Sequence, residues 1–356
     1  MYAIVFDMNK VFLALLAFVP ITFGAQALSV SPIFIFFFSA LAIVPLAKYI
    51  GEATEELARY TSPAFGGLLN ATFGNATELI IGVFALNAGL LEVVKASITG
   101  SIIGNLLLVL GMAMVAGGYS RKEQKFNATA AQAASSTLLL AVIALVIPAV
   151  FLQTAGSVDA GVLVEHLSLI VAVLMILAYV ASLVFSLHTH THLYQEEIAR
   201  AEAKWGKGKS VLVLMLATIA VAFMSEILVG AIEPLVISFG WTQLFIGVIF
   251  VAIVGNATEH YSAITVAMKN RMDLSLQISI GSATQIAMFV APLLVLISLF
   301  FPTSMSLVFN TFELAAIIFS VFIVGAIVQD GESNWFEGTQ LLLAYLIMAV
   351  AFYFHP

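Results

Sequence analysis

The pentapeptide Gly-Asn-Ala-Thr-Glu occupies residues 74–78 and recurs unchanged at residues 255–259, 181 positions later. The shared register extends to both sides of the motif. Four further pairs of small residues keep the same offset: Gly66 and Gly247, Ala71 and Ala252, Gly100 and Gly281, and Ser101 and Ser282. A chance match of five residues would not carry these flanking matches with it. The chain is therefore internally duplicated around this motif.

Both copies lie in strongly apolar sequence. Hydrophobic residues make up 62% of the 356 residues and charged residues only 9%, against about 25% charged in soluble domains. Stretches of about 20 apolar residues, long enough to cross a bilayer core, recur throughout. We expect eleven membrane helices, near residues 11–28, 33–50, 64–88, 96–118, 129–153, 162–187, 210–238, 243–268, 274–300, 308–328 and 336–354.

Basic residues predict the orientation of these helices. With eleven spans, twelve of the 13 Lys and Arg residues fall on the side of the N-terminus, and only Lys95 falls opposite. Cytoplasmic loops carry such an excess of Lys and Arg. We therefore expect a cytoplasmic N-terminus and an external C-terminus. The compact chain without a targeting extension is expected in the plasma membrane. The first segment follows Asp7 without a small-residue cleavage site, so we interpret it as retained.

The duplication and the span count together predict inverted repeats. Each copy would hold five helices, and an odd number makes the second copy enter the membrane from the opposite side. The expected divisions are an extra helix (1–30), a first repeat (31–190), a cytoplasmic linker (191–209) and a second repeat (210–356). Secondary transporters use inverted repeats for alternating access, with the site near the midplane.

The two motif glutamates, Glu78 and Glu259, lie near the middle of their apolar segments. An acidic residue at a helix centre costs about 2.5–3.5 kcal/mol on insertion scales, so it indicates a functional site. Asn75 and Asn256 precede them by three positions, which places each Asn–Glu pair on one helical face. Ser262 extends that polar stripe in the second copy.

Bends are expected at the glycines of the motif, Gly74 and Gly255, because glycine weakens a helix. A bend would expose backbone carbonyls, which is tolerated at this depth only beside a cavity or an ion. Carboxylate, amide and carbonyl oxygens are the ligands of Ca²⁺. We therefore predict a metal site of Glu78, Glu259, Asn75 and Asn256. The chain has no cysteine, so a thiolate site is excluded.

Charge balance predicts exchange. Two facing carboxylates repel each other, and either one Ca²⁺ or two protons neutralises them. The empty form would carry two uncompensated charges inside the membrane and would change state slowly. Glu78 and Glu259 are thus expected to bind Ca²⁺ or protons in a mutually exclusive manner.

The paired motifs, the trailing Gly-Ser and the segment Ser333–Gly338 resemble the cation/proton exchanger family, above all its bacterial Ca²⁺/H⁺ antiporters. The resemblance covers nearly the whole chain. It implies that Glu78 and Glu259 form the shared Ca²⁺ and proton site. It implies supporting or pathway roles for further polar residues, namely Glu55, Glu226, Ser101, Ser282, Asn105 and Gln285.

Three other functions stay open. A sodium/calcium exchanger shares inverted repeats, but its repeats usually place Pro where Thr77 and Thr258 stand here. A passive channel would conduct without counter-movement of protons. An intramembrane enzyme is disfavoured, because the sequence has no zinc-protease or aspartyl signature. Expected partners are Ca²⁺, protons and lipid, without a cofactor or nucleic acid; a homo-oligomer and a role of His188, His190 and His192 in regulation are left open.

Overall fold

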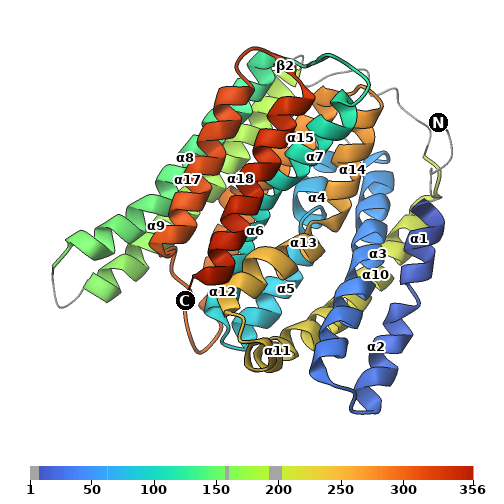
Figure 1. Cartoon of the computed structure of the whole chain (residues 1–356), viewed down its shortest axis with the longest axis vertical. Helices are drawn as coiled ribbons and strands as arrows, with labels where there is room; N and C mark the ends of the chain where they lie inside the picture. The colour runs from blue at the N-terminus through green and yellow to red at the C-terminus, as the bar shows by residue number, and fades with distance from the viewer. Residues whose placement is uncertain (1–7, 62, 157–159, 192–202, 356) are drawn as a thin grey trace.

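The computed structural model describes residues 8–61, 63–156, 160–191 and 203–355, so His192 lies outside it. Nearly all of the described chain is helical (Figure 1). The elements up to residue 189 are α1 (Met8–Leu15), α2 (Phe18–Ala27), α3 (Pro32–Ala58), α4 (Pro63–Phe73), α5 (Ala76–Asn87), α6 (Leu91–Ile103), η1 (Gly104–Val109), α7 (Leu110–Gly118), β1 (Gln124–Lys125), α8 (Ala128–Thr154), α9 (Ala160–Val184) and η2 (Phe185–Thr189).

The second part of the chain is also built from helices interrupted by short breaks and π-helical turns. Its elements are α10 (Lys207–Gly230), α11 (Ile232–Phe239), α12 (Gln243–Phe245), η4 (Ile246–Val251), α13 (Ala252–Gly255), α14 (Ala257–Met268), α15 (Met272–Gln285), η5 (Ile286–Val290), α16 (Ala291–Ser298), α17 (Thr311–Ile327), β2 (Glu332–Ser333) and α18 (Trp335–Phe354).

The helices are those of a multi-pass membrane protein. Among the described residues, eight helical stretches are long and apolar enough to span a bilayer, and the bent pair 243–255 and 257–268 makes a ninth. The broken pair α4–α5 and the 17-residue α17 would complete the expected eleven. The all-α membrane fold is confirmed, whereas the count of eleven stays a prediction.

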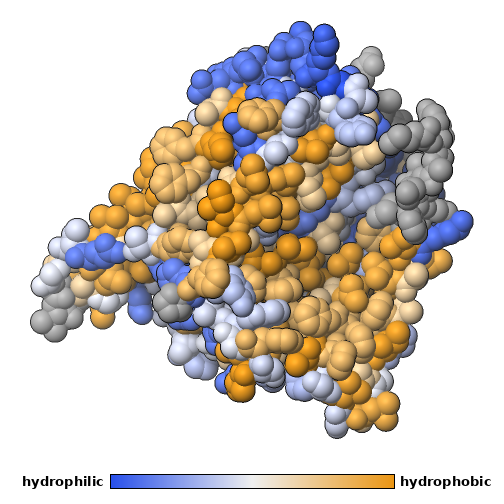
Figure 2. Space-filling view, viewed as in Figure 1, coloured by the Kyte–Doolittle hydropathy of each residue, from blue (hydrophilic) through white to orange (hydrophobic). Residues whose placement is uncertain are grey.

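The outer surface has the hydropathy that lipid requires. Exposed Leu, Ile, Val and Phe side chains occur along α8, α9, α10 and α18. In Figure 2 hydrophobic residues cover the flank of the bundle, and hydrophilic residues gather at its upper edge. Soluble proteins rarely expose contiguous apolar surfaces of this extent, and such surfaces are typical of sites that contact a membrane or a protein partner.

The helix breaks predicted at the motif are present in both copies. Asn75 separates α4 from α5 with φ −104° and ψ 25°, and Asn256 separates α13 from α14 with φ −96° and ψ 13°. The second break bends the chain by 60°. Glycine directly before each asparagine lowers the cost of leaving helical geometry.

A second pair of irregularities keeps nearly the same offset. The wide helical turn η1 begins at Gly104, and η5 begins at Ile286. Such π-helical turns are rare and frequently mark functional sites. Each follows the Gly-Ser pair of its copy by a few residues, so the two copies share local geometry as well as sequence.

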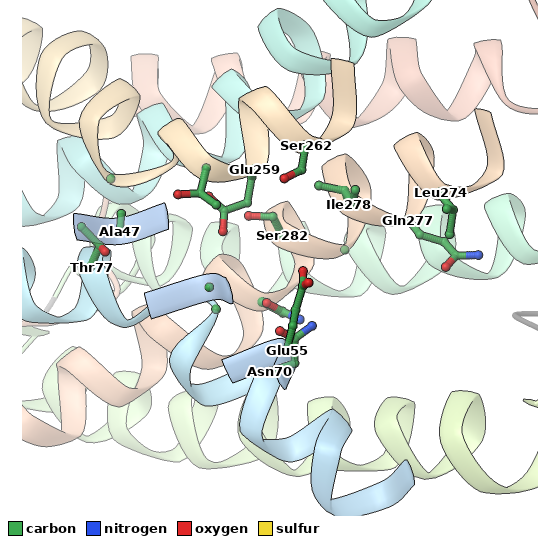
Figure 3. Close-up of a pocket in the computed structure, with 16 residues that line it drawn as sticks. Ala47, Glu55, Asn70, Thr77, Glu259, Ser262, Leu274, Gln277, Ile278 and Ser282 are labelled. Atoms are coloured by element: carbon green, nitrogen blue, oxygen red, sulfur yellow. The ribbon is translucent and has the colours of Figure 1, made fainter. Parts of the chain in front are cut away.

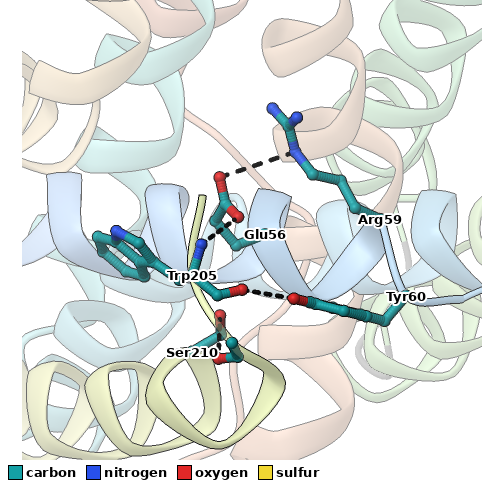
Figure 4. Close-up of polar contacts among 6 residues, drawn as sticks. Glu56, Arg59, Tyr60, Trp205 and Ser210 are labelled. Carbon is teal, nitrogen blue, oxygen red and sulfur yellow. Dashed lines mark hydrogen bonds and ion pairs between the residues drawn. The ribbon is translucent and has the colours of Figure 1, made fainter. Parts of the chain in front are cut away.

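The helix α3 is longer than the expected segment 33–50, because it continues to Ala58. Its charged last turns are joined to the start of α10 (Figure 4). The backbone N–H of Trp205 donates to Glu56 over 3.0 Å, and the Tyr60 hydroxyl donates to the Trp205 carbonyl over 2.6 Å. Glu56 also pairs with Arg59 at 3.8 Å. Trp205, two residues before α10, is thereby fixed to the end of α3.

Candidate ion-binding site

Glu78 lies in the first turn of α5, directly after the break at Asn75. Its side chain packs on the backbone of the other copy, since a methyl group on Gly255 would stand 3.0 Å from the Glu78 Cγ. A side chain at 255 would therefore crowd Glu78. Glu78, from the first copy, lies against the helix break of the second copy, four residues before Glu259 in the sequence.

Glu259 occupies the equivalent first turn of α14 and lines a cavity of about 310 Å³ (Figure 3). The cavity lies between α3, α4, α14 and α15. Its polar lining includes Thr258, Ser262, Ser282 and Gln285 around Glu259, with Glu55, Asn70 and Gln277 also present. Glu78 is not part of this lining. One glutamate thus faces the cavity, while the other is enclosed behind Gly255.

Asn256 is at the centre of a buried hydrogen-bond network. Its amide nitrogen donates to the Ser101 hydroxyl over 2.7 Å and to the Ala252 carbonyl over 2.9 Å. Its amide oxygen accepts from the Asn105 amide over 2.8 Å and from the Ser282 hydroxyl over 3.5 Å. The Asn105 amide also donates to Ser282 over 3.0 Å. This network joins the two copies at the second break.

Asn75 makes fewer side-chain hydrogen bonds than Asn256. Its amide nitrogen donates to the Gln285 side chain in a short hydrogen bond. Its amide oxygen is buried and has no hydrogen-bond partner among the described residues. The sequence treats Asn75 and Asn256 as equivalent, but in this conformation only Asn75 has an unengaged oxygen.

Several other buried oxygens of the described residues also lack a hydrogen-bond partner. Within the described chain, buried side-chain oxygens near the two breaks that lack a hydrogen-bond partner are both carboxylate oxygens of Glu78, Oδ1 of Asn75, Oδ1 of Asn105 and Oγ1 of Thr258. Buried polar groups are normally satisfied, and exceptions need a physical reason. Carboxylate, amide and hydroxyl oxygens are hard ligands that suit Ca²⁺ or Mg²⁺ rather than a soft metal. No cluster of three His, Cys, Asp or Glu is found in the described part of the chain.

The residues implied by resemblance divide into two groups. Ser101, Ser282, Asn105 and Gln285 all bond to a motif asparagine. Glu55 lines the cavity, whereas Glu226 is exposed on α10 and is not part of the cavity lining.

Four polar lining residues were not predicted as site residues from the sequence. Thr77 and Thr258 stand inside the repeated motif and could have been found there, whereas Asn70 and Gln277 carry no local signal.

Helices α6 and η4 pack closely on each other. A methyl group on Gly100 of α6 would collide with the backbone of Val248 in η4, and one on Gly247 would stand 2.5 Å from the Ala96 Cβ. The cavity runs along α15 from Leu274 to Gln285 and along α3 from Ala47 to Glu55. Leu274 lies three residues after Arg271, and Glu55 lies four residues before Arg59. The cavity therefore extends from Glu259 towards the ends of α15 and α3 that carry these basic residues.

Comparison with known proteins identifies the family of the chain. The profile of the "Sodium/calcium exchanger protein" family matches residues 31–188 and residues 209–354. The chain is 48% identical to a Ca²⁺/H⁺ antiporter of Synechocystis, covering 98% of both proteins. It is also 48% identical to the Ca²⁺/H⁺ antiporter ChaA of Bacillus subtilis, covering 97% of this chain and 99% of that protein.

Solved structures extend the comparison. The structure of native YfkE superposes with a TM-score of 0.84 at 45% identity, covering 97% of this chain and all of that one. The H⁺/Ca²⁺ exchanger CAX gives a TM-score of 0.68 at 16% identity, which shows a common fold. The resemblance inferred from the motifs is thus confirmed, and the chain belongs to the sodium/calcium exchanger protein family.

Proposed function

We propose that the chain is a secondary antiporter that exports Ca²⁺ in exchange for protons, and that Glu78 and Glu259 carry both ions alternately. The names of the 48% identical relatives support the pair of ions. The packing of Glu78 on Gly255, four residues before Glu259, supports the site. Asn75 supplies a further oxygen, while Asn256 orients the site through Ser101, Asn105 and Ser282.

The observation that carries this proposal is the state of Glu78. Both of its carboxylate oxygens are buried without a hydrogen-bond partner among the described residues. An isolated ionised carboxylate in such surroundings costs several kcal/mol. Glu78 must therefore be neutralised, by a proton in one loaded form and by a divalent cation in the other.

Neutralisation also explains why transport is exchange. One Ca²⁺ balances two carboxylates, and two protons do the same, so either loaded form can be occluded. With neither ion, two like charges face each other at low dielectric constant, where their repulsion is strong. The unloaded protein changes conformation too slowly for uncoupled transport. Each conformational change therefore carries either Ca²⁺ or protons.

Alternating access is part of this proposal, and the cavity beside Glu259 supports it. The cavity extends from Glu259 to the open end near Arg59 and Arg271, while α6 packs closely on η4. The positive-inside rule makes that open end cytoplasmic, so the N-terminus is cytoplasmic, the C-terminus is external and the plasma membrane is the site of action. Glu55 guides ions through this cavity, and Glu226 takes the same role on the external side.

The experiment is flux in proteoliposomes with simultaneous recording of pH. An outward-directed proton gradient should drive Ca²⁺ uptake in the absence of sodium, with protons moving the opposite way. Glu78→Gln and Glu259→Gln should each abolish uptake, whereas Glu92→Gln, an exposed glutamate of α6, should not. Normal uptake by either motif variant would remove the basis of the proposal.

Sodium/calcium exchange is the second candidate, because the family profile carries that description. The sodium–calcium exchanger NCX_Mj shares 17% identity with this chain at a TM-score of 0.55, which supports a common fold only. Ca²⁺ flux that needs a sodium gradient and ignores a pH gradient would favour this candidate.

A further inference from the structure

Two helix contacts related by the internal repeat are in opposite states. Helix α6 of the first copy lies against η4 of the second copy so closely that glycine is required on both sides, at Gly100 and at Gly247. Glycine permits such backbone contact between membrane helices. The mirrored contact would join α15 of the second copy to α4 of the first, but a methyl group built on Gly281 of α15 meets no atom within 4 Å. The glycine of α6 is thus packed, whereas its counterpart in α15 is not.

The register makes the comparison residue by residue. The α6 residues that approach η4 through the two glycines are Val93, Ala96, Ser97 and Gly100. The offset of 181 assigns their counterparts in α15 as Leu274, Gln277, Ile278 and Gly281. All four of these counterparts line the cavity. The open cavity is therefore the separated equivalent of the closed contact.

We propose that α15 closes onto α4 in the opposite state, with Gly281 packing on the α4 backbone near Gly66, while Gly100 and Val248 separate. Gly66 is the counterpart of Gly247, and a methyl group on it would now stand 3.2 Å from the Ala58 Cβ. α4 accordingly leaves the end of α3 as it moves towards α15. This inference rests on the proposed alternating access, and it assigns two mirrored glycine contacts as the surfaces that close each side.

The difference in packing between Gly100 and Gly281 can be tested by substitution. Gly281→Ala places a methyl group in open space in the present conformation, so the protein should fold normally. The same methyl group would obstruct the closed α15–α4 contact, and overpacking of this kind should slow exchange about tenfold or more. Gly24→Ala in α2 is the matched control, because its methyl group also meets nothing within 4 Å, and its exchange rate should equal that of the wild type.

A second readout reports conformation without any transported ion. The chain contains no cysteine, so a single Gln277→Cys variant can be labelled from the cavity by a membrane-impermeant thiol reagent. Adding Gly281→Ala should leave the labelling rate at the level of Gln277→Cys alone or raise it. Adding Gly100→Ala, which strains the contact with Val248, should lower the labelling rate severalfold by favouring the opposite state.

The outcomes separate the two proposals. Wild-type exchange by Gly281→Ala would overturn the glycine inference, as would loss of cavity labelling in that variant. The labelling results would stand even if the exchanged ions were not Ca²⁺ and protons. If Gly100→Ala fails to fold, the comparison of Gly281→Ala with Gly24→Ala decides alone.

Discussion

Asn75 and Asn256 occupy matching positions in the two copies, yet replacing each by alanine should have different consequences. Asn256→Ala removes three hydrogen bonds of 2.7 to 2.9 Å, to Ser101, Ala252 and Asn105. Asn75→Ala removes one bond, to Gln285. Side-chain hydrogen bonds inside membrane proteins contribute about 0.6 kcal/mol each. The expected loss in free energy of unfolding is therefore about 2 kcal/mol for Asn256→Ala and about 0.6 kcal/mol for Asn75→Ala.

Ca²⁺ binding should respond in the opposite order. The Asn75 oxygen has no hydrogen-bond partner among the described residues. In the proposed site it binds Ca²⁺ directly, so its removal should weaken Ca²⁺ binding about tenfold or more, as for other lost contacts to a charge. The Asn256 oxygen is already occupied by Asn105 and Ser282, so its loss should affect Ca²⁺ affinity less.

The assay pairs reversible unfolding in detergent with calorimetric Ca²⁺ titration. Asn87→Ala is the control, because Asn87 is exposed at the end of α5, and neither quantity should change. Equal unfolding losses for Asn75→Ala and Asn256→Ala, or a stronger Ca²⁺ defect in Asn256→Ala, would refute the asymmetry described for the two breaks.

Two further predictions concern the frame around the site. Glu56→Ala removes the acceptor for the Trp205 N–H, so trypsin cleavage after Lys204 or Lys207 should accelerate. Glu52→Ala is the control, because its partner Lys48 lies on the same helix, and it should leave the cleavage rate unchanged. Equal cleavage rates in the two variants would argue against a stabilising role of the Glu56–Trp205 contact. Glu313→Ala removes the capping box of α17 and the 3.1 Å bond from Thr99, and should cost about 1–3 kcal/mol of unfolding free energy without changing the Ca²⁺ concentration for half-maximal exchange. A large shift in that concentration would place Glu313 in the transport pathway instead.

The repeated pentapeptide was the basis for predicting the helix breaks and the polar site. Glycine followed by asparagine within an apolar segment predicts a helix break, and the breaks at Asn75 and Asn256 are where that reasoning puts them. The acidic residue that follows predicts a polar site at depth. These features are local, so one sequence is enough to find them.

Other features depend on long-range contacts that cannot be recognised in a single sequence. The partner of Asn256 is Asn105, 151 residues away, and nothing near either residue identifies the other. The last turns of α3 were missed because Glu52, Glu55 and Glu56 lower the hydropathy there, although salt bridges and the contact with Trp205 hold them in a helix. Gly100 and Gly281 have similar surroundings in sequence, so only the structure distinguishes the packed side from the open one.

The central claim is that Glu78 and Glu259 together hold either one Ca²⁺ or two protons. Proton release on Ca²⁺ binding, recorded with a pH indicator in weakly buffered detergent solution, tests it most directly. As the starting pH is lowered, the number of protons released per Ca²⁺ should rise towards two in the wild type and towards one in any motif Glu→Gln variant that still binds. Ca²⁺ binding by the wild type with no proton release at any pH would contradict the account.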